Sequence, residues 1–314
     1  MLIFTTATRL SGNTNIIKRM ILAGSDGLRF NFSYGKSEEK INNIKQAVET
    51  ANELNAKTKI LIDLPNVKTR LGGFPTQKFY VKENQTLHIK TGEYTDDPVS
   101  FIPIQQENIG DIFYPEQTII IDEGEIAIKV VDIVSKNEII CVALNSGTIY
   151  SFKGLSWKKE KSDEEENQDI LENKEQKIEM LTGLIEISPD YIACPSIKNE
   201  KRAKYYKELI DSINWKHRPF LAFKIETTHG INNLEKIIPY CDVIILERGS
   251  LGINSDYEKM GIYQNHIIEF CKKKNKKIFI STQILESTIN NYIPQRSEIS
   301  DLTNMVIKEV DGII

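Results

Sequence analysis

The sequence predicts an α/β protein, a (β/α)8 TIM barrel with a small all-β domain inserted after the third strand. Short apolar segments alternate with amphipathic helical patterns in both the first and the last part of the chain, which is typical of parallel sheets covered by helices. From about Gly72 to Gly154 this alternation stops, and short β-rich segments separated by turn residues take its place. A chain of 314 residues is long enough for both parts.

The first part of the chain contains three predicted strands and two predicted helices. The expected strands are Leu2–Thr6, Gly27–Ser33 and Lys59–Asp63. Asn13 or Thr14 caps a helix that runs through Ala23, and Ser37 caps the next helix. Two acidic residues directly after Ser37 suit the positive end of that helix.

The inserted domain is expected to be a small β-barrel over residues 72–154, so that residues 1–71 and 155–314 form a discontinuous (β/α)8 barrel. Its expected strands lie within Thr86–Lys90, Thr118–Ile121, Glu125–Ile133 and Glu138–Ala143. The charged stretch Lys158–Asp169 is interpreted as a solvated connection that leads into a helix within Glu164–Leu181.

After the insertion, strands and helices alternate again. The expected strands are Asp190–Cys194, Phe220–Glu226, Val243–Leu246, Ile278–Thr282 and Gly312–Ile314. The expected helices are Lys201–Ile213, Ile231–Ile238, Glu258–Lys273 and Glu298–Glu309. Together with the first three strands this makes eight, the number that closes a barrel.

Composition narrows the function classes. The net charge is −4 and the one lysine-rich stretch, at 272–277, is short, so no nucleic-acid partner is expected. No stretch reaches the ~18 apolar residues of a membrane span, and the N-terminus does not resemble a signal peptide. The four cysteines have no paired spacing, which favours reduced, buried thiols over disulfides or zinc. We therefore expect a cytoplasmic protein that does not associate with a membrane.

Polar residues collect at the predicted carboxyl ends of the strands, where the active sites of such barrels lie. Lys224 and Glu226 are two residues apart and so point to the same face of their strand. Alone, they fit a structural ion pair better than an active site, because ion pairs are commoner. The other strands add Arg29, Asn31, Ser33, Asp63, Arg248, Thr282 and Gln283. Cations, carboxylates and hydroxyls on one rim suit a small anionic substrate bridged by a divalent metal.

Five segments carry a resemblance to a known family. They are Arg29-Phe-Asn-Phe-Ser-Tyr-Gly35, Asp63 with Arg70, Lys224-Ile-Glu226, Arg248-Gly-Ser-Leu-Gly252 and Thr282-Gln-Ile-Leu-Glu-Ser287. In this order they resemble the signature segments of pyruvate kinase over nearly the whole chain. Lys153-Gly154 stands where that family leaves its inserted β-domain.

The resemblance implies roles for the rim residues. Lys224 would steady the transferring phosphoryl group and the enolate, and Glu226 would ligate Mg²⁺ or Mn²⁺. Arg29, Gly249, Ser250 and Thr282 would bind phosphoenolpyruvate, with Arg29 and Thr282 catalytic. Asn31 and Arg70 would serve the nucleotide, ADP or ATP. Asn31, Ser33 and Asp63 would form the monovalent-cation region, and the inserted domain would be a lid that excludes water.

The chain also departs from the family pattern. Leu64 and Lys68 resemble the potassium-independent branch, in which the lysine replaces the bound cation, so that K⁺ is not required; a drifted loop lysine is the alternative. Ser250 stands where the family has its second metal-ligating Asp, and a neutral hydroxyl is a poor ligand for a hard divalent ion. Glu247 is either the substitute ligand or a surface acid. Tyr34 replaces the family histidine.

Three hypotheses follow. The first is a pyruvate kinase-like phosphotransferase that acts on phosphoenolpyruvate, or a related enol phosphate, and ADP or ATP. The second is a catalytically impaired relative that binds a ligand or a partner, which Ser250 and Tyr34 favour; carbon–carbon bond cleavage on a metal-held enolate is a third. Because no helix follows the last strand, the barrel wall there is expected to be open and apolar, and to form a homo-oligomer or partner interface.

Overall fold

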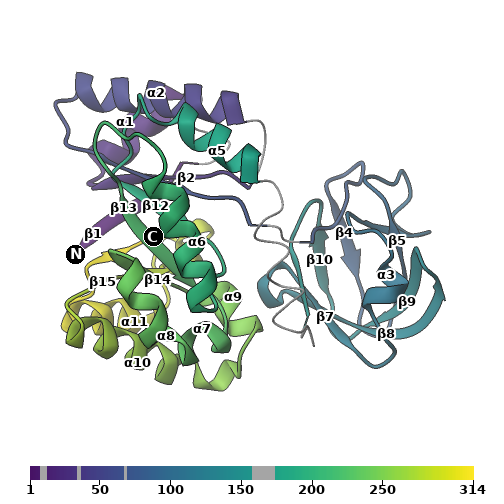
Figure 1. Ribbon diagram of the computed structural model, residues 1–314. Coiled ribbons are helices and arrows are strands. Elements are labelled where there is room, and N and C mark those ends of the chain that lie inside the picture. Colours follow the sequence, from purple (N-terminus) through teal and green to yellow (C-terminus); the bar gives the residue numbers. More distant parts are fainter. Residues whose placement is uncertain (8–12, 34–36, 67–68, 158–173) are drawn as a thin grey trace. The chain divides into compact units, whose positions relative to one another are not determined.

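The computed structural model describes residues 1–7, 13–33, 37–66, 69–157 and 174–314. The chain divides into two compact units, one made of residues 1–66 and 161–314 and the other of residues 67–160. Figure 1 shows the first unit as strands surrounded by helices and the second as a β-rich unit. Among the described residues, no helix has both the length and the apolar character needed to cross a membrane.

The first unit is a closed barrel of eight parallel strands in the order β1-β16-β15-β14-β13-β12-β3-β2. The strands are β1 (Leu2–Thr6), β2 (Gly27–Asn31), β3 (Lys59–Asp63), β12 (Tyr191–Cys194), β13 (Phe220–Ile225), β14 (Val243–Glu247), β15 (Lys277–Ser281) and β16 (Gly312–Ile313). The (β/α)8 architecture predicted from the sequence is therefore confirmed.

Helices cover the outside of this barrel (Figure 1). They are α1 (Thr14–Leu22), α2 (Ser37–Glu53), α5 (Lys174–Gly183), α6 (Glu200–Asp211), α7 (Thr228–Asn232), α8 (Leu234–Ile237), α9 (Arg248–Ile253), α10 (Met260–Lys273) and α11 (Arg296–Ile307). Short 3-10 turns are η2 (Ile238–Tyr240), η3 (Tyr257–Lys259) and η4 (Glu286–Ile289). The predicted cap of the first helix is confirmed, because Asn13 Oδ1 accepts a hydrogen bond from the backbone of Asn15.

Three local predictions were wrong. The strand predicted to reach Ser33 ends at Asn31, because the Asn31 side chain accepts from the Ser33 backbone N–H and turns the chain. The helix predicted over Ile231–Ile238 is two short helices and a 3-10 turn, broken at Asn233, whose φ and ψ are not helical. The short helix α9 was missed, since two glycines hide its pattern and its cap is a glutamate.

Alternation along each strand separates two cores. Residues such as Ile192, Phe223 and Ile280 face the surrounding helices in the larger core. The barrel interior holds a second cluster: Phe4, Leu61, Tyr191, Ala193, Ala222, Val243, Ile245 and Phe279. Lys224 lies two residues beyond Ala222, so it continues the interior face of β13 toward the strand's carboxyl end.

The barrel is hydrogen-bonded where β16 meets β1, with Leu2 opposite Gly312 and Ile3 opposite Ile313. The backbone ladder is therefore closed at this seam, whereas the prediction of an exposed apolar wall concerns side chains and not strand pairing. Three apolar side chains are exposed on neighbouring parts of the sequence around these strands: Ile3 on β1, and Val306 and Ile307 on α11.

In the second unit the strands form a six-stranded sheet, in the order β11-β7-β8-β9-β5-β6, and a two-stranded sheet of β10 and β4. The sequence predicted a small β-barrel in this part of the chain, and the described strands there are all in these two sheets. The elements are β4 (Lys78–Val81), β5 (Thr86–Thr91), β6 (Ile102–Ile104), α3 (Ile109–Ile112), β7 (Thr118–Ile121), η1 (Asp122–Gly124), β8 (Ile126–Ser135), β9 (Glu138–Ala143), β10 (Gly147–Tyr150) and β11 (Leu155–Trp157).

The second unit extends beyond the predicted boundaries of 72 and 154 because of backbone pairing. Leu71 forms a bridge with Ile104, and β11 pairs with β7. The predicted charged connection, Lys158–Asp169, lies outside the described residues. All four cysteines are free and buried, as predicted.

Candidate active site

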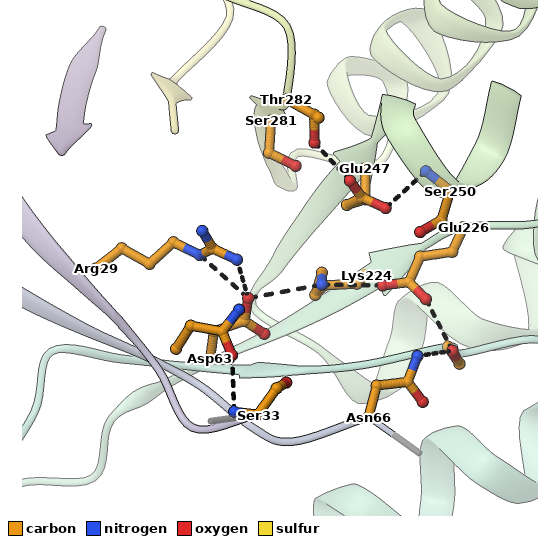
Figure 2. Close-up of polar contacts among 12 residues, drawn as sticks. Arg29, Ser33, Asp63, Asn66, Lys224, Glu226, Glu247, Ser250, Ser281 and Thr282 are labelled. Carbon is orange, nitrogen blue, oxygen red and sulfur yellow. Dashed lines mark hydrogen bonds and ion pairs between the residues drawn. The ribbon is translucent and has the colours of Figure 1, made fainter. Parts of the chain in front are cut away.

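Lys224 is the centre of the polar cluster at the carboxyl ends of the barrel strands (Figure 2). Its Nζ lies 3.0 Å from Glu226 Oε1 and 3.6 Å from Asp63 Oδ2. The same Asp63 oxygen accepts from Arg29, at 3.1 Å from Nε and 2.5 Å from Nη2. The structure thus brings together four residues that the sequence predicted for one rim. Arg29 lies on β2, Asp63 on β3 and Lys224 on β13, and Glu226 directly follows β13.

The charge state of Lys224 follows from its neighbours. Burial alone would lower the pKa of the ammonium, but the carboxylates of Asp63, Glu226 and Glu247 outweigh it and raise the pKa above its ordinary value. Lys224 is therefore a permanent cation within a largely water-excluded site, where a charge acts more strongly than in water.

Glu226 is held by two residues that were not predicted as site residues from the sequence. Its Oε2 accepts from Ser196 Oγ at 2.7 Å, and Ser196 Oγ accepts from Asn66 Nδ2 at 2.9 Å. Ser196 directly follows Cys194-Pro195 at the end of β12 and has a positive φ of 52°. A serine just after a strand was the available signal, but its contact with Glu226 depends on the pairing of β12 with β13.

Glu247 lies at the end of β14 and is a buried residue rather than a surface acid. Its Oε2 accepts from the backbone N–H of Ser250 at 3.0 Å and so caps α9, while its Oε1 accepts from Thr282 Oγ1 at 2.5 Å. Burial raises the pKa of the Glu247 carboxyl, but Lys224 and these hydrogen bonds outweigh it, so the net effect is a lowered pKa. Glu247 is therefore an ionised carboxylate.

Thr282 has an unusual backbone. Its φ is 76° and that of Gln283 is 54°, a region that β-branched residues rarely occupy. Arg248 supports this turn by donating to the carbonyl of Thr282 from Nε and Nη2, at 3.1 and 2.7 Å, and to that of Gln283 at 2.8 Å. Arg248 also forms an ion pair with Asp301.

The contacts of Arg248 change its predicted role. It was expected as a rim cation, but its buried guanidinium binds two backbone carbonyls and Asp301 of α11. Asp301 was not singled out in the sequence, because only the fold brings α11 to Arg248 at the start of α9. Strained residues held by such contacts are typical of functional sites.

The predicted monovalent-cation region is partly described. Asn31 and Asp63 lie opposite each other on β2 and β3, and Ser33 follows β2. Asp63 Oδ1 is buried and has no hydrogen-bond partner in the described residues, so it is an acceptor without a donor. Lys68 and Tyr34 lie outside the described residues.

The remaining predicted residues lie in different places. Gly249 is buried at the start of α9, next to Ser250, whose backbone is capped by Glu247. Arg70 belongs to the second unit, where its Nη1 donates to the Phe152 carbonyl at 3.1 Å.

The cluster contains the type of oxygen ligand that a divalent metal ion needs, but few of them. Glu226 offers carboxylate oxygens, which Mg²⁺ and Mn²⁺ prefer. Within the described residues, however, no group of three or more His, Cys, Asp or Glu side chains is arranged to hold a metal. A small anionic substrate would have to supply further oxygen ligands, as phosphates do at magnesium sites.

The protein is thus a (β/α)8 barrel with a cluster of charged residues at the carboxyl ends of its strands, where the active sites of such barrels lie. The chain belongs to the pyruvate kinase family, since the family model "Pyruvate kinase, barrel domain" matches residues 2–314.

Individual relatives agree. The chain is 27% identical over 298 residues to a pyruvate kinase of Thermococcus litoralis, which covers 95% of this chain and 61% of the relative. It is 28% identical to one from Mycoplasma pneumoniae, over 91% of this chain and 56% of the relative. It is 27% identical to one from Clostridium perfringens, over 97% and 62%. The chain thus spans about 60% of the length of these relatives.

Proposed function

We propose that the protein moves a phosphoryl group between phosphoenolpyruvate, or a related enol phosphate, and ADP or ATP, with a divalent metal. The main support is the buried Lys224 ammonium, 3.0 Å from Glu226 and 3.6 Å from Asp63, with Arg29 on the same aspartate. A fixed cation in such a position can stabilise both a transferring phosphoryl group and the negative oxygen of an enolate.

The other residues have roles in binding. Arg29 would bind the phosphate of the substrate, and the backbone at Gly249 and Ser250 its carboxylate. Thr282 would lie beside the carbon that becomes the methyl group. Asn31 and Arg70 would contact the nucleotide, and the second unit would act as a lid that keeps water from competing for the phosphoryl group.

Glu226 is the residue we propose to hold Mg²⁺ or Mn²⁺, which when bound would neutralise charge on the phosphates. Glu247 was the alternative ligand, but it caps the backbone of α9 at Ser250 and holds the hydroxyl of Thr282, so we assign it to these two groups. We therefore place it outside the metal site. We further propose that K⁺ is not required, with Lys68 as the cation surrogate for the region of Asn31, Ser33 and Asp63.

The test is an assay of pyruvate formation from phosphoenolpyruvate and ADP with Mg²⁺ or Mn²⁺. Lys224→Ala should lower kcat by about 100- to 1000-fold, the usual cost of removing a group that stabilises developing charge. Lys259→Ala, an exposed lysine paired with Asp256, is the matched control and should not change the rate.

Three outcomes would change this proposal in different ways. Binding of phosphoenolpyruvate and Mn²⁺ without turnover would favour the impaired, ligand-binding relative. A gain in rate on Ser250→Asp would show that Ser250 limits the metal site. Equal rates for wild type and Lys224→Ala would contradict the proposal.

We also propose a cytoplasmic protein that forms a homo-oligomer, or binds a partner, through the exposed apolar residues Ile3, Val306 and Ile307. Light scattering after gel filtration tests this directly. Val306→Glu together with Ile307→Glu should give a monomer if these residues form the interface.

A further inference from the structure

Glu247 is a buried carboxylate to which the proposed phosphoryl transfer assigns no role. Figure 2 shows it between Thr282 and Ser250, on the side of the cluster where β14 and β15 end. The backbone register pairs Glu247 with Ser281, so Thr282 is the next residue beyond the pair. This placement gives a carboxylate direct access to the hydroxyl of a proposed catalytic residue.

The direction of the hydrogen bond determines what the pair can do. Thr282 Oγ1 donates to Glu247 Oε1 at 2.5 Å, so the hydroxyl hydrogen points at the carboxylate. The hydroxyl hydrogen of Thr282 is used in this bond, and the lone pairs on the same oxygen point elsewhere, where they can accept a proton from a substrate. A hydroxyl both donates and accepts, so it can take up one proton while it gives up another.

The pair is also held in one geometry. The Ser250 N–H fixes the second oxygen of Glu247, and Arg248 fixes the carbonyls of Thr282 and Gln283 in their left-handed conformation. Lys224 on β13 is paired with Ile245 of the adjacent strand β14, two residues before Glu247 and on the same interior face. A carboxylate and an ammonium thus stand ready on one site, the arrangement needed to form an enolate.

We propose that Glu247 is the proton acceptor that works through Thr282 when a 2-oxo acid is converted to its enolate. The substrate class rests on the proposed function; the step itself needs no nucleotide. The C–H bond on the carbon next to the carbonyl breaks, and its proton passes to Thr282 Oγ1. The hydroxyl proton of Thr282 passes to Glu247, which becomes a carboxylic acid. The electron pair of the C–H bond moves to the carbonyl oxygen, which Lys224 stabilises. Re-protonation reverses each transfer.

The experiment is deuterium exchange into the methyl group of pyruvate in D2O with Mg²⁺ and without nucleotide, followed by proton NMR. Wild type should exchange. Glu247→Gln keeps an acceptor for Thr282 but accepts no proton, and should lower the exchange rate at saturation by about 100-fold or more with KM nearly unchanged. Thr282→Val should have the same effect, and Thr282→Ser should retain exchange.

The controls separate chemistry from folding. Glu309→Gln, an exposed residue paired with Lys272, is the matched Glu→Gln variant and should exchange like wild type. Thermal unfolding of each variant verifies that it is folded, and Thr282→Ser restores the hydroxyl if Thr282→Val is unstable.

Three results would overturn the proposal: no exchange by wild type, exchange by Glu247→Gln within about threefold of wild type, or a change in KM alone. The phosphoryl-transfer assay is run separately. Exchange without phosphoryl transfer would refute the proposed function and leave the role of Glu247 standing. Phosphoryl transfer with full exchange in Glu247→Gln would do the opposite.

Discussion

The interior of the barrel has two layers built on the same strands, and they differ in what they bury. The lower layer is apolar and aromatic: Phe4, Tyr191 and Phe279 have ring centroids 5.5 to 5.6 Å apart. Two residues further along the strands, the upper layer carries Asp63, Lys224 and Glu247. Because successive inward positions are two residues apart, one strand contributes to both layers.

The difference shows that one layer of the barrel interior stabilises the fold and the other carries the groups for the reaction. Apolar side chains in the lower layer gain from leaving water and need no partners. Charges in the upper layer are costly to bury unless they are paired, and each described charge there has a partner of opposite sign or a hydrogen-bond donor. Substitutions in the lower layer should therefore affect folding, and substitutions in the upper layer should affect the reaction.

The largest expected effect is in the lower layer. Phe279→Ala removes a fully buried ring that packs on Phe4 and Tyr191 and touches the site of Gly312 so closely that a Cβ there would lie 2.8 Å from the ring. The free energy of unfolding should fall by about 3–5 kcal/mol, measured by urea unfolding. Tyr292→Ala, at a fully exposed aromatic, is the control. A loss below about 1 kcal/mol for Phe279→Ala would contradict the division.

A smaller effect is expected behind the upper layer. Asp301→Asn weakens the ion pair that holds Arg248 on the Thr282 and Gln283 carbonyls. Roughly tenfold lower kcat is expected, with KM and unfolding less affected, since Thr282 loses its fixed position. Steady-state kinetics of phosphoryl transfer, or of exchange, measures this. Glu309→Gln serves again as the exposed control. Unchanged kcat would mean that Arg248 does not position Thr282.

The smallest effect concerns Lys40, a partly buried ammonium bound to a backbone carbonyl, in contrast to Lys224, which is surrounded by carboxylates. Lys40 of α2 is half-buried and donates to the Phe32 carbonyl at 2.7 Å. Burial lowers the pKa of its ammonium to about 8, whereas three carboxylates raise that of Lys224. Between about pH 8 and 10.5 folded Lys40 releases its proton before the unfolded chain does, so stability should rise with pH.

Because Lys40 is partly in solvent, the rise should be only about 1 kcal/mol. Urea unfolding of wild type and Lys40→Met at pH 7.5 and 10 measures this rise. The free energy of unfolding of wild type should increase relative to that of Lys40→Met at the higher pH. Lys45→Met, an exposed lysine on the same helix, should leave the pH dependence of wild type in place. An equal slope in wild type and Lys40→Met would refute the assignment.

Much of the fold was predictable because each strand and most helices carry a local pattern. The strands containing Leu61 and Ile245 are continuous apolar runs, as buried parallel strands are, and Asn13 marks the start of α1. Motif spacing predicted that Lys224, Glu226, Asp63 and Arg29 share one rim. Helix α9 and the break at Asn233 were not predictable, because capping by Glu247 and the contacts of Asn233 involve few residues and no periodicity.

The sequence by itself determined the alternation of strands and helices, the inserted β-rich part and the identity of the charged residues. Local propensity and the two-residue period of a strand contain that information. Only the tertiary structure decided that Ser196 binds Glu226, that Arg248 supports Thr282 and that Glu247 accepts from Thr282 rather than facing solvent. These contacts join strands and helices far apart in the chain, so they depend on closure of the barrel and not on any local pattern.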